Sequence, residues 1–248
     1  MVAKAELAHR PGSGENICWI AFDAVGTLID AEPPVKTAYH RVALRHGSRL
    51  TEDEIAARFT AEFQRSEARE TAGPESWQRS DRLSTSEAQE RNRWKKIVAN
   101  VIDDVADDEG CFEELFKHFA RPASWRCYSD VTGTLTSLRD AGYQLAVASN
   151  FDQRLHAICD GLPELEPLQL RVISSQVGYR KPSRHFFESL IRAAGCDADE
   201  ILLVGDDSVN DVQGGQAAGI NALQLARHGQ SDSAAISNLL QLTELLDA

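Results

Sequence analysis

The sequence predicts an α/β fold in which a parallel sheet carries helices on both faces and an all-helical segment interrupts the pattern. Two observations carry this prediction. Five short apolar runs end in polar residues or glycine turns, which is typical of parallel strands buried on both faces. Helix-patterned segments separate the later runs, and this alternation of strand and helix predicts a Rossmann-like parallel sheet.

The first strand is expected within ICWIAFDAVGTLI, an apolar run broken by Asp23 and then by Gly26-Thr27. The later strands are expected in YQLAVASN, LQLRVISS, EILLVGDD and INALQLA. Helices are expected between them, in TGTLTSLRDAG, FDQRLHAICDGL, SRHFFESLIRAAG and NDVQGGQAAG. Because the carboxyl ends of parallel strands lie along one edge, residues far apart in the sequence should meet there.

The inserted segment shows four helical stretches: PVKTAYHRVALRHG, TEDEIAARFTAEFQRSEARE, SEAQERNRWKKIVANVID and EGCFEELFKHFA. Thr51, followed three residues later by Glu54, predicts a capping box. The segment should form a lid over the carboxyl edge of the sheet, in which Trp77 and Trp94 are interpreted as packing residues. We therefore expect a flexible lead at residues 1–15, an α/β core at 16–32 and 120–248, and a helical cap at 33–119.

Composition limits the partners. With 26 Lys and Arg against 38 Asp and Glu, the net charge is −12, which argues against nucleic acid or an anionic membrane as a partner. The opening residues contain no apolar run long enough for a signal peptide or a membrane anchor. The five scattered cysteines form no CxxC pair and indicate reduced thiols, which together with the missing signal favours a cytoplasmic location. No pattern in the sequence indicates an oligomeric state.

Polar residues close three of the predicted strands and begin one helix. These residues are Asp23, Ser149-Asn150, Lys181, Asp206-Asp207 and Asp211. Each alone could cap a turn or a helix, or remain solvated. At one sheet edge, however, the carboxylates would repel one another and lose hydration unless a cation bound them. Mg²⁺ is the cation that suits ligands consisting only of oxygen.

The order of these motifs resembles that of the haloacid dehalogenase (HAD) superfamily. The four motifs stand here as FDAVGTL, AVASNFD, GYRKP and LLVGDDSVND, and the resemblance runs from about residue 17 to the end. The helical insertion is similar to the type-one cap of that superfamily. In finer detail, the sequence resembles one branch, haloacid-dehalogenase-like hydrolase domain-containing protein three. The resemblance lies in RNRWKKIV, SWRCY, LAVASNFDQRL and the valine of DAVGTL.

The resemblance implies a hydrolase of small phosphorylated metabolites with Mg²⁺ as its cofactor. Asp23 would be the nucleophile and would form an aspartyl-phosphate that water then hydrolyses. Mg²⁺ would be held by Asp23, the backbone carbonyl of Val25 and Asp206. Ser149 would donate its hydroxyl to the phosphoryl group, and Lys181 would balance the negative charge.

The same resemblance assigns supporting roles. Gly26 and Thr27 fit a tight turn whose N–H groups would face the phosphate, with the Asn150 N–H close by. Asp211 would hydrogen-bond the metal ligands or Lys181 without binding the substrate itself, and Asp207 would have the same supporting role.

One position departs from the pattern. Phosphatases of this superfamily carry a second aspartate two residues after the nucleophile, which protonates the leaving alkoxide and later activates water. The residue here is Val25, which can do neither. Since general acid–base catalysis contributes about 10²–10⁴ in rate, alkyl phosphates should react slowly. The candidates for a replacement acid are Asp152, Asp207 and Glu32.

Several interpretations therefore remain open. The first is a metal-dependent phosphatase that is weak, prefers good leaving groups or takes its acid from elsewhere. The second is a 2-haloacid dehalogenase, whose halide needs no proton, although LLVGDDSVND is unusually acidic for one and no clear halide-binding motif appears among Arg41, Arg45, Arg49 and Arg58. A phosphonatase would need a cap lysine, and the lysines available are Lys36, Lys95 and Lys96. The last is a protein that binds Mg²⁺ and a phosphorylated ligand, or a partner, without useful turnover.

Overall fold

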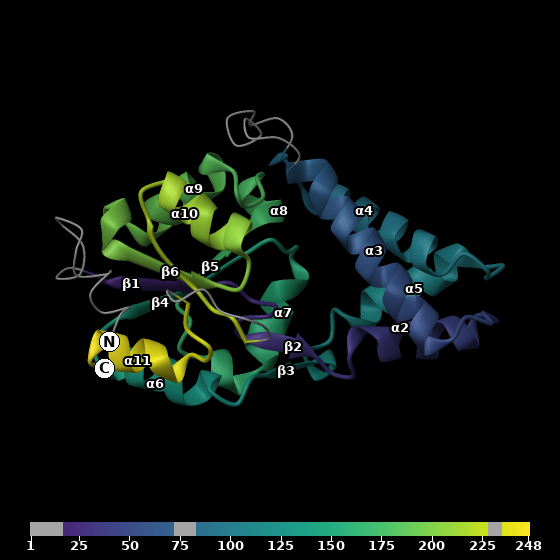
Figure 1. The fold of residues 1–248 in the computed structure, drawn as a ribbon, viewed down its shortest axis with the longest axis horizontal. Helices are drawn as coiled ribbons and strands as arrows, with labels where there is room; N and C mark the ends of the chain where they lie inside the picture. Colours follow the sequence, from purple (N-terminus) through teal and green to yellow (C-terminus); the bar gives the residue numbers. More distant parts are fainter. Residues whose placement is uncertain (1–16, 72–82, 228–234) are drawn as a thin grey trace.

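A computed structural model describes residues 17–71, 83–227 and 235–248 of the chain. The predicted lead at residues 1–15 and Trp77 lie outside this part. Figure 1 shows two bodies, a sheet covered by helices and a separate group of helices beside it. Among the described residues, no helix is both long and apolar enough to cross a membrane.

The sheet has five parallel strands, and the first strand of the sequence lies at its centre. The strand order is β5-β4-β1-β6-β7. The strands are β1 (Trp19–Phe22), β4 (Gln144–Ser149), β5 (Leu170–Ile173), β6 (Ile201–Gly205) and β7 (Asn221–Gln224). Every residue of β1 and β6 is buried, because helices cover both faces of the sheet. This architecture confirms the predicted α/β fold.

Two apolar cores lie on opposite faces of the sheet, and alternate residues of β1 divide between them. Ile20 and Phe22 join the core that includes side chains of α6, α7 and α11, whereas Trp19 and Ala21 join the core under α9. This division follows from the two-residue period of a strand. The helices on the sheet are α6 (Val131–Asp140), α7 (Arg154–Gly161), α8 (Ser174–Val177), α9 (Arg184–Ala194), α10 (Gly214–Ala217) and α11 (Leu240–Leu246).

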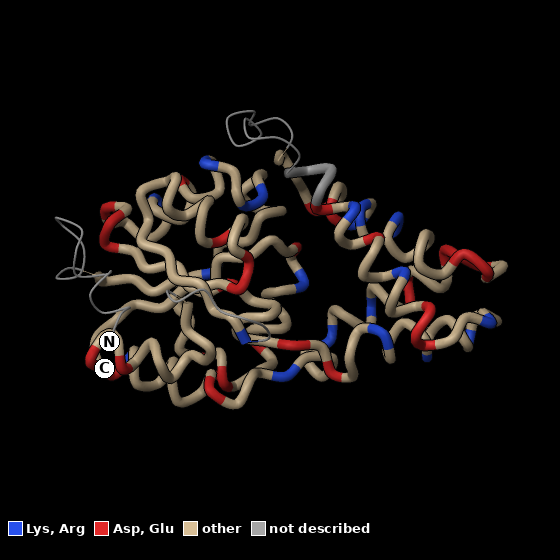
Figure 2. The backbone as a smooth tube through the Cα atoms, viewed as in Figure 1, with Lys and Arg blue, Asp and Glu red and all other residues tan. Residues whose placement is uncertain are grey.

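The second body contains the four predicted helices of the insertion, namely α2 (Val35–Arg45), α3 (Glu52–Thr71), α4 (Glu87–Val101) and α5 (Asp108–His118). They enclose a core of their own, in which Ile55, Ile97 and Phe112 are among the largest buried side chains. The predicted capping box is present, since the Glu54 N–H donates to Thr51 Oγ1 (3.3 Å) and the Thr51 N–H donates to Glu54 Oε2 (2.8 Å). In Figure 2, both acidic and basic residues lie along these helices.

The two bodies are joined by a short antiparallel ribbon that the sequence does not predict. It pairs β2 (Ile29–Ala31) with β3 (Trp125–Cys127). Each strand has three residues, which is too short for a periodic pattern to reveal. The ribbon places the entry to the insertion next to its exit.

A second connection between the bodies lies on the opposite side of the insertion, beside Lys181. The Arg180 N–H donates to the Leu83 carbonyl (2.8 Å), and the Thr85 N–H donates to the Gly178 carbonyl (2.9 Å). The Arg180 guanidinium also donates to both carboxylate oxygens of Glu90 on α4, at 2.8 and 3.0 Å. The helical body is therefore bonded to the core at two separate places.

Candidate active site

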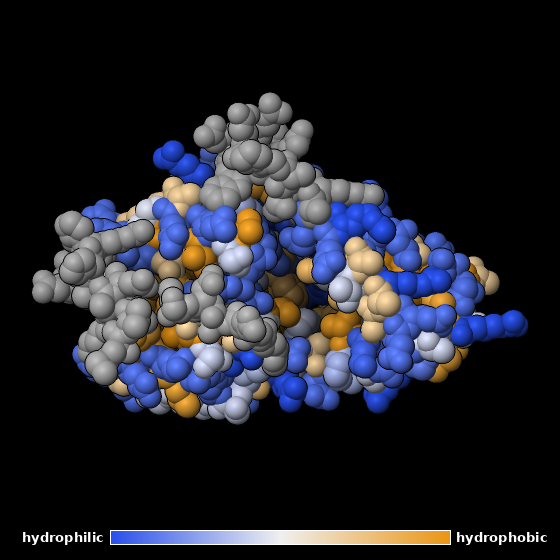
Figure 3. Space-filling model, in the orientation of Figure 1, coloured by the Kyte–Doolittle hydropathy of each residue, from blue (hydrophilic) through white to orange (hydrophobic). Residues whose placement is uncertain are grey.

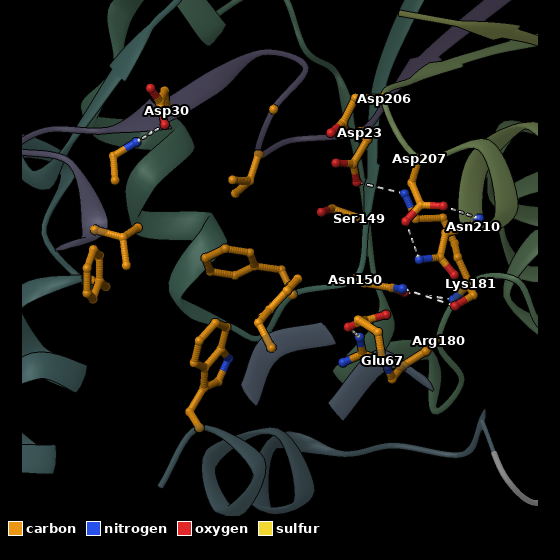
Figure 4. A pocket seen from close by; sticks show the side chains of 18 of the residues that line it. Asp23, Asp30, Glu67, Ser149, Asn150, Arg180, Lys181, Asp206, Asp207 and Asn210 are labelled. Carbon is orange, nitrogen blue, oxygen red and sulfur yellow. Dashed lines mark hydrogen bonds and ion pairs between the residues drawn. The ribbon is translucent and has the colours of Figure 1, made fainter. Parts of the chain in front are cut away.

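The polar residues that close the strands meet at one edge of the sheet, as predicted. Asp23 follows β1, Ser149 ends β4 and Asp206 follows β6; the paired strands are in register, with Phe22 opposite both Val147 and Val204. All three side chains line one cavity of about 410 Å³ that lies between the two bodies. Figure 4 shows them on neighbouring strand ends, pointing toward a common space. Figure 3 shows the surface hollowed between the bodies, with apolar side chains in the hollow.

Lys181 is the cation of this site, and its ammonium group is fully used. Its Nζ donates to Asp23 Oδ1 (2.7 Å), Asp211 Oδ1 (2.5 Å) and the Ala148 carbonyl (2.8 Å). The side chain is 2% exposed. Burial alone would lower the pKa of Lys181, but the carboxylates of Asp211 and Asp23 raise it above its ordinary value. The lysine therefore stays charged and balances part of the negative charge around Asp23.

Asn150 positions Lys181 through a reciprocal pair of hydrogen bonds. Asn150 Nδ2 donates to the Lys181 carbonyl (3.0 Å), and the Lys181 N–H donates to Asn150 Oδ1 (2.7 Å). The sequence predicted a role for the Asn150 backbone near the phosphate, and this side-chain role was missed. It depends on the approach of two loops that are 31 residues apart.

Three carboxylates crowd the site. Oxygens of Asp23, Asp206 and Asp211 lie within 4.8 Å of one another. Loss of hydration inside the cavity, and then the charge of Asp23, raise the pKa of Asp206 to about 6. Burial likewise raises the pKa of Asp211, although Lys181 opposes this. Like charges held this close favour binding of a cation.

The donor set fits Mg²⁺. Both oxygens of Asp211 are already used, one by Lys181 and the other by the Asp207 N–H (3.1 Å). Asp23 and Asp206 are thus the carboxylates that would ligate the ion, while Asp211 supports Lys181. Mg²⁺ commonly binds through one or two carboxylates and keeps several waters.

The turn after Asp23 differs from its predicted role. Gly26 has φ +85°, and a Cβ there would lie 2.5 Å from Asp206 Oδ2, so glycine is required. However, the Gly26 N–H donates to the Ile29 carbonyl (3.0 Å), and the Thr27 N–H donates to the Ala24 carbonyl (3.4 Å). Gly26 lines the cavity, whereas Thr27 is fully buried and donates its hydroxyl to Asp206 Oδ1 (3.3 Å). These two N–H groups serve the turn itself, and so the expectation that they face a phosphate was wrong.

None of the three candidate acids is placed to replace the missing aspartate. Asp207 caps the π-helical turn Ser208–Gln213 by accepting from the Val209 and Asn210 N–H groups, both at 2.8 Å. Asp207 lines the cavity, and its second oxygen accepts from Asn210 Nδ2 (3.0 Å), so both of its oxygens face the turn. That Asp207 shares the supporting role of Asp211 stays a prediction. Asp152 is buried against Arg154, and Glu32 lies 3.4 Å from Arg126; neither residue lines the cavity.

Val25 itself lines the cavity. It is 39% exposed and is one of three large apolar residues that are exposed in the part of the chain that the structure describes. The position of the usual acid therefore presents an apolar surface to any ligand bound at Asp23.

The opposite wall of the cavity is aromatic, and the sequence did not predict it. Seven aromatic side chains line it: Tyr39, Phe59, Phe63, Trp94, Phe119, Trp125 and Phe151. Trp94 was interpreted as a packing residue; it does stack on Phe63, with ring centroids 6.3 Å apart, and it lines the cavity as well. The signal available in the sequence was the spacing of Phe59 and Phe63, which puts two rings on one face of helix α3, in line with the buried Ile55.

The arginines of the cavity are also different from those considered in the sequence. Arg93, Arg154 and Arg180 line it, whereas Arg41, Arg45, Arg49 and Arg58 do not. Each of the three lining arginines forms an ion pair with a carboxylate. Among the described residues, every arginine of the cavity therefore has its charge balanced by a carboxylate, and none offers an uncompensated charge to a halide.

Comparison with known proteins gives the family. A model of the haloacid dehalogenase-like hydrolases matches residues 19–219. Haloacid dehalogenase-like hydrolase domain-containing protein 3 from Homo sapiens is 27% identical over 221 residues, covering 87% of this chain and 83% of that protein.

Solved structures agree on the fold. A defluorinating L-2-haloacid dehalogenase gives a TM-score of 0.73 at 19% identity, covering 96% of this chain and 98% of that one. A HAD phosphatase from Thermococcus onnurineus gives 0.62 at 22% identity, covering 92% and 96%. Both kinds of enzyme share this architecture, so the fold does not distinguish a dehalogenase from a phosphatase. That distinction depends on the residues of the site.

Proposed function

The chain belongs to the haloacid dehalogenase-like hydrolase family, and from this we propose that it is a Mg²⁺-dependent phosphohydrolase acting on a small phosphorylated metabolite through Asp23. One observation carries the proposal: the oxygens of Asp23, Asp206 and Asp211 lie within 4.8 Å of one another beside a single lysine. One ammonium group cannot balance three carboxylates. A dehalogenase, which uses no metal, would have no reason to keep this excess of negative charge.

Asp23, Lys181 and Ser149 have separate roles in the proposed reaction. One oxygen of Asp23 is held by Lys181, which orients the carboxylate so that its other oxygen can attack phosphorus. Lys181 also stabilises the negative charge that develops on the phosphoryl oxygens, and the Ser149 hydroxyl donates to one of them. Bound Mg²⁺ would neutralise charge between the Asp23 carboxylate and the phosphoryl group.

The reaction then has two steps. The Asp23 oxygen forms a bond to phosphorus while the bond from phosphorus to the leaving oxygen breaks. Water next attacks phosphorus, which releases phosphate and restores the Asp23 carboxylate. Val25 can neither donate a proton to the leaving oxygen in the first step nor accept one from water in the second, so the first step favours leaving groups that are stable as anions.

The proposal is tested by measuring phosphate release from acetyl phosphate, with and without Mg²⁺. Acetate leaves without a proton, so the test does not depend on the missing acid. We expect Mg²⁺-dependent turnover that Asp23→Asn abolishes. Asp30→Asn is the matched control, because Asp30 also lines the cavity but lies outside the carboxylate cluster.

Two outcomes would overturn the proposal. Chloride release from 2-chloropropionate without a metal would identify a dehalogenase. Binding of Mg²⁺ and of phosphate without hydrolysis of any acyl or aryl phosphate would identify a binding protein.

A further inference from the structure

We propose that the aromatic side of the cavity binds an uncharged aromatic ring of the substrate, so that the substrates of this site are aryl or aroyl phosphates. This inference rests on the proposed phosphohydrolase function, and it names the class of leaving group. Two independent features point to it, a continuous wall of rings and the apolar surface of Val25.

The seven rings form an unbroken series, which we call the aromatic wall. In order, the rings are Trp94, Phe63, Phe59, Tyr39, Phe119, Trp125 and Phe151, and the centroids of successive rings lie 5.2–6.3 Å apart. The series starts on α4, passes through α3 and α2, crosses the connecting ribbon and ends beside Asn150. It therefore spans both bodies around a single cavity.

The cap part of the wall is incompletely covered by the protein. Phe59, Phe63 and Trp94 are only half-buried, whereas Tyr39 in the same part of the wall is 2% exposed. Phe112 in the same helical body is also 2% exposed and does not line the cavity. Large aromatic side chains left partly uncovered around a cavity gain free energy when a ligand ring covers them. Ring-to-ring contacts at these distances add a preference for flat aromatic ligands over aliphatic ones.

The charges around the wall are compensated, which argues for an uncharged ring. Arg154 binds Asp152 through two hydrogen bonds of 2.7 and 2.8 Å. Arg180 binds Glu90, and Glu67 accepts from Arg180 (3.0 Å) as well as from Arg93. A charged group on the ligand ring would have to compete with these buried pairs.

Val25 restricts the chemistry of the leaving group. As the Asp23 oxygen bonds to phosphorus, the electron pair of the breaking bond stays on the leaving oxygen, which receives no proton from the residue beside it. Phenolates and carboxylates tolerate this charge, whereas alkoxides do not. The wall selects a ring and Val25 selects a stable anion; aryl and aroyl phosphates satisfy both conditions.

The size of the cavity agrees with such a ligand. A volume of about 410 Å³ lies in the lower part of the range of small-molecule pockets, about 300–1,000 Å³. It accommodates a phosphoryl group with about one or two rings.

The decisive experiment compares benzoyl phosphate with acetyl phosphate in the wild-type protein with Mg²⁺. Both substrates lose a carboxylate of similar acidity, so they differ chiefly in the ring. We expect kcat/KM to be about 20- to 100-fold higher for benzoyl phosphate, since burial of one ring in an apolar site has this effect. Equal values for the two substrates would overturn the aromatic inference and leave the proposed function intact. Turnover of neither substrate would instead overturn the proposed function.

A pair of variants locates the effect. Phe63→Leu should reduce the preference for benzoyl over acetyl phosphate by about 5- to 10-fold, because Leu keeps bulk but loses the ring. Phe112→Leu is the matched control, a ring of the same helical body outside the cavity, and should leave the preference unchanged. A preference that survives Phe63→Leu, or that falls equally in both variants, would overturn the role of the wall.

Discussion

Val25 removes the usual proton donor from the neighbourhood of Asp23, and its side chain already faces the cavity. Val25→Asp should therefore place a carboxyl group where the leaving oxygen departs. We expect kcat/KM for an alkyl phosphate such as glycerol phosphate to rise by about 10²-fold, the lower end of the range for general acid–base catalysis. The kcat/KM for acetyl phosphate should change little, because it reports the first step, in which acetate leaves without a proton.

Val25→Asn is the control for this prediction, since it has nearly the same shape as aspartate but cannot transfer a proton. Equal gains in the Asn and Asp variants would show that polarity, not acid catalysis, limits alkyl substrates. No gain in an Asp variant that still binds Mg²⁺ would show that the proton comes from another group.

Asp206 makes Mg²⁺ binding dependent on pH. The ion binds the carboxylate form of Asp206. Loss of hydration inside the cavity and the Asp23 charge raise the pKa of Asp206 to about 6, so protons compete with the metal below that pH. We expect Mg²⁺ to raise the Tm clearly at about pH 7.5, and its apparent affinity to fall about tenfold for each pH unit below about 6.

Without metal, the same group has the opposite effect on stability. Because its folded-state pKa is raised, the folded protein binds more protons than the unfolded chain between the unfolded pKa and about 6, and the metal-free protein loses stability as the pH rises through this window. Asp206→Asn should abolish the pH dependence of Mg²⁺ binding near pH 6 and reduce the second effect, of which Asp211, whose pKa is also raised, keeps a part. A Mg²⁺-induced Tm shift of equal size at about pH 5 and 7.5 would contradict the role of Asp206 as a ligand.

At the scale of the elements, helix α4 is bound to the loop that carries Lys181. Glu90 on α4 is 2% exposed and accepts two hydrogen bonds from Arg180 and one from Thr85 Oγ1 (2.7 Å). Burial opposes ionisation of Glu90, but Arg180 and Arg93 lower its pKa below the ordinary value. The pair therefore contributes stability above the ordinary pKa of glutamate, and this contribution is lost as the pH falls through the lowered value.

Glu90→Gln should be strongly destabilising. It removes a carboxylate partner of buried Arg180 and leaves the bond to Glu67 (3.0 Å), so the cost should approach the ~3–5 kcal/mol that breaking a buried pair typically has. Because Arg180 precedes Lys181 directly, we also expect a lower kcat on acetyl phosphate in the folded fraction. Urea unfolding and steady-state kinetics measure the two effects separately.

The matched control is Glu113→Gln on α5. Glu113 pairs with Arg91, but both side chains are partly exposed, and such pairs contribute about 0–1 kcal/mol. Similar losses of stability in the two variants would show that the Arg180–Glu90 pair has no special role in joining the bodies.

For the whole molecule, the sequence predicts the sheet and its catalytic edge better than it predicts the cavity. Asp23 and Asp206 follow strands, and Ser149 ends one, whose apolar runs are clear in the sequence, so their meeting at one edge follows from topology alone. The Asn150–Lys181 pair and the β2–β3 ribbon depend on short contacts across the chain, which carry no periodic signal. The aromatic wall combines rings from helices and loops whose facing is decided only when the two bodies pack together.

The two connections between the bodies make a final prediction about motion. Substrate must enter a cavity that lies between them, and opening the side beside Lys181 breaks the hydrogen bonds of the Thr85 and Arg180 N–H groups. The β2–β3 ribbon lies on the other connection and can act as the hinge. The hydrogen bond from the Glu32 N–H to the Ser124 carbonyl (2.8 Å), beside this ribbon, then stays intact during opening. Hydrogen exchange of these three amides therefore separates opening from general unfolding.

We expect Mg²⁺ together with orthovanadate, an analogue of the transferring phosphoryl group, to slow exchange at Thr85 and Arg180 by about tenfold or more while Glu32 changes little. The reason is that vanadate bound at Asp23 and Lys181 favours the closed arrangement, in which the bonds beside Lys181 are made. Mass spectrometry of peptides that cover residues 83–86, 178–181 and 31–33 measures all three amides. Equal slowing at all three sites would mean that the ligand stabilises the whole fold, and no slowing at Thr85 and Arg180 with vanadate bound would mean that substrate enters without separating the two bodies.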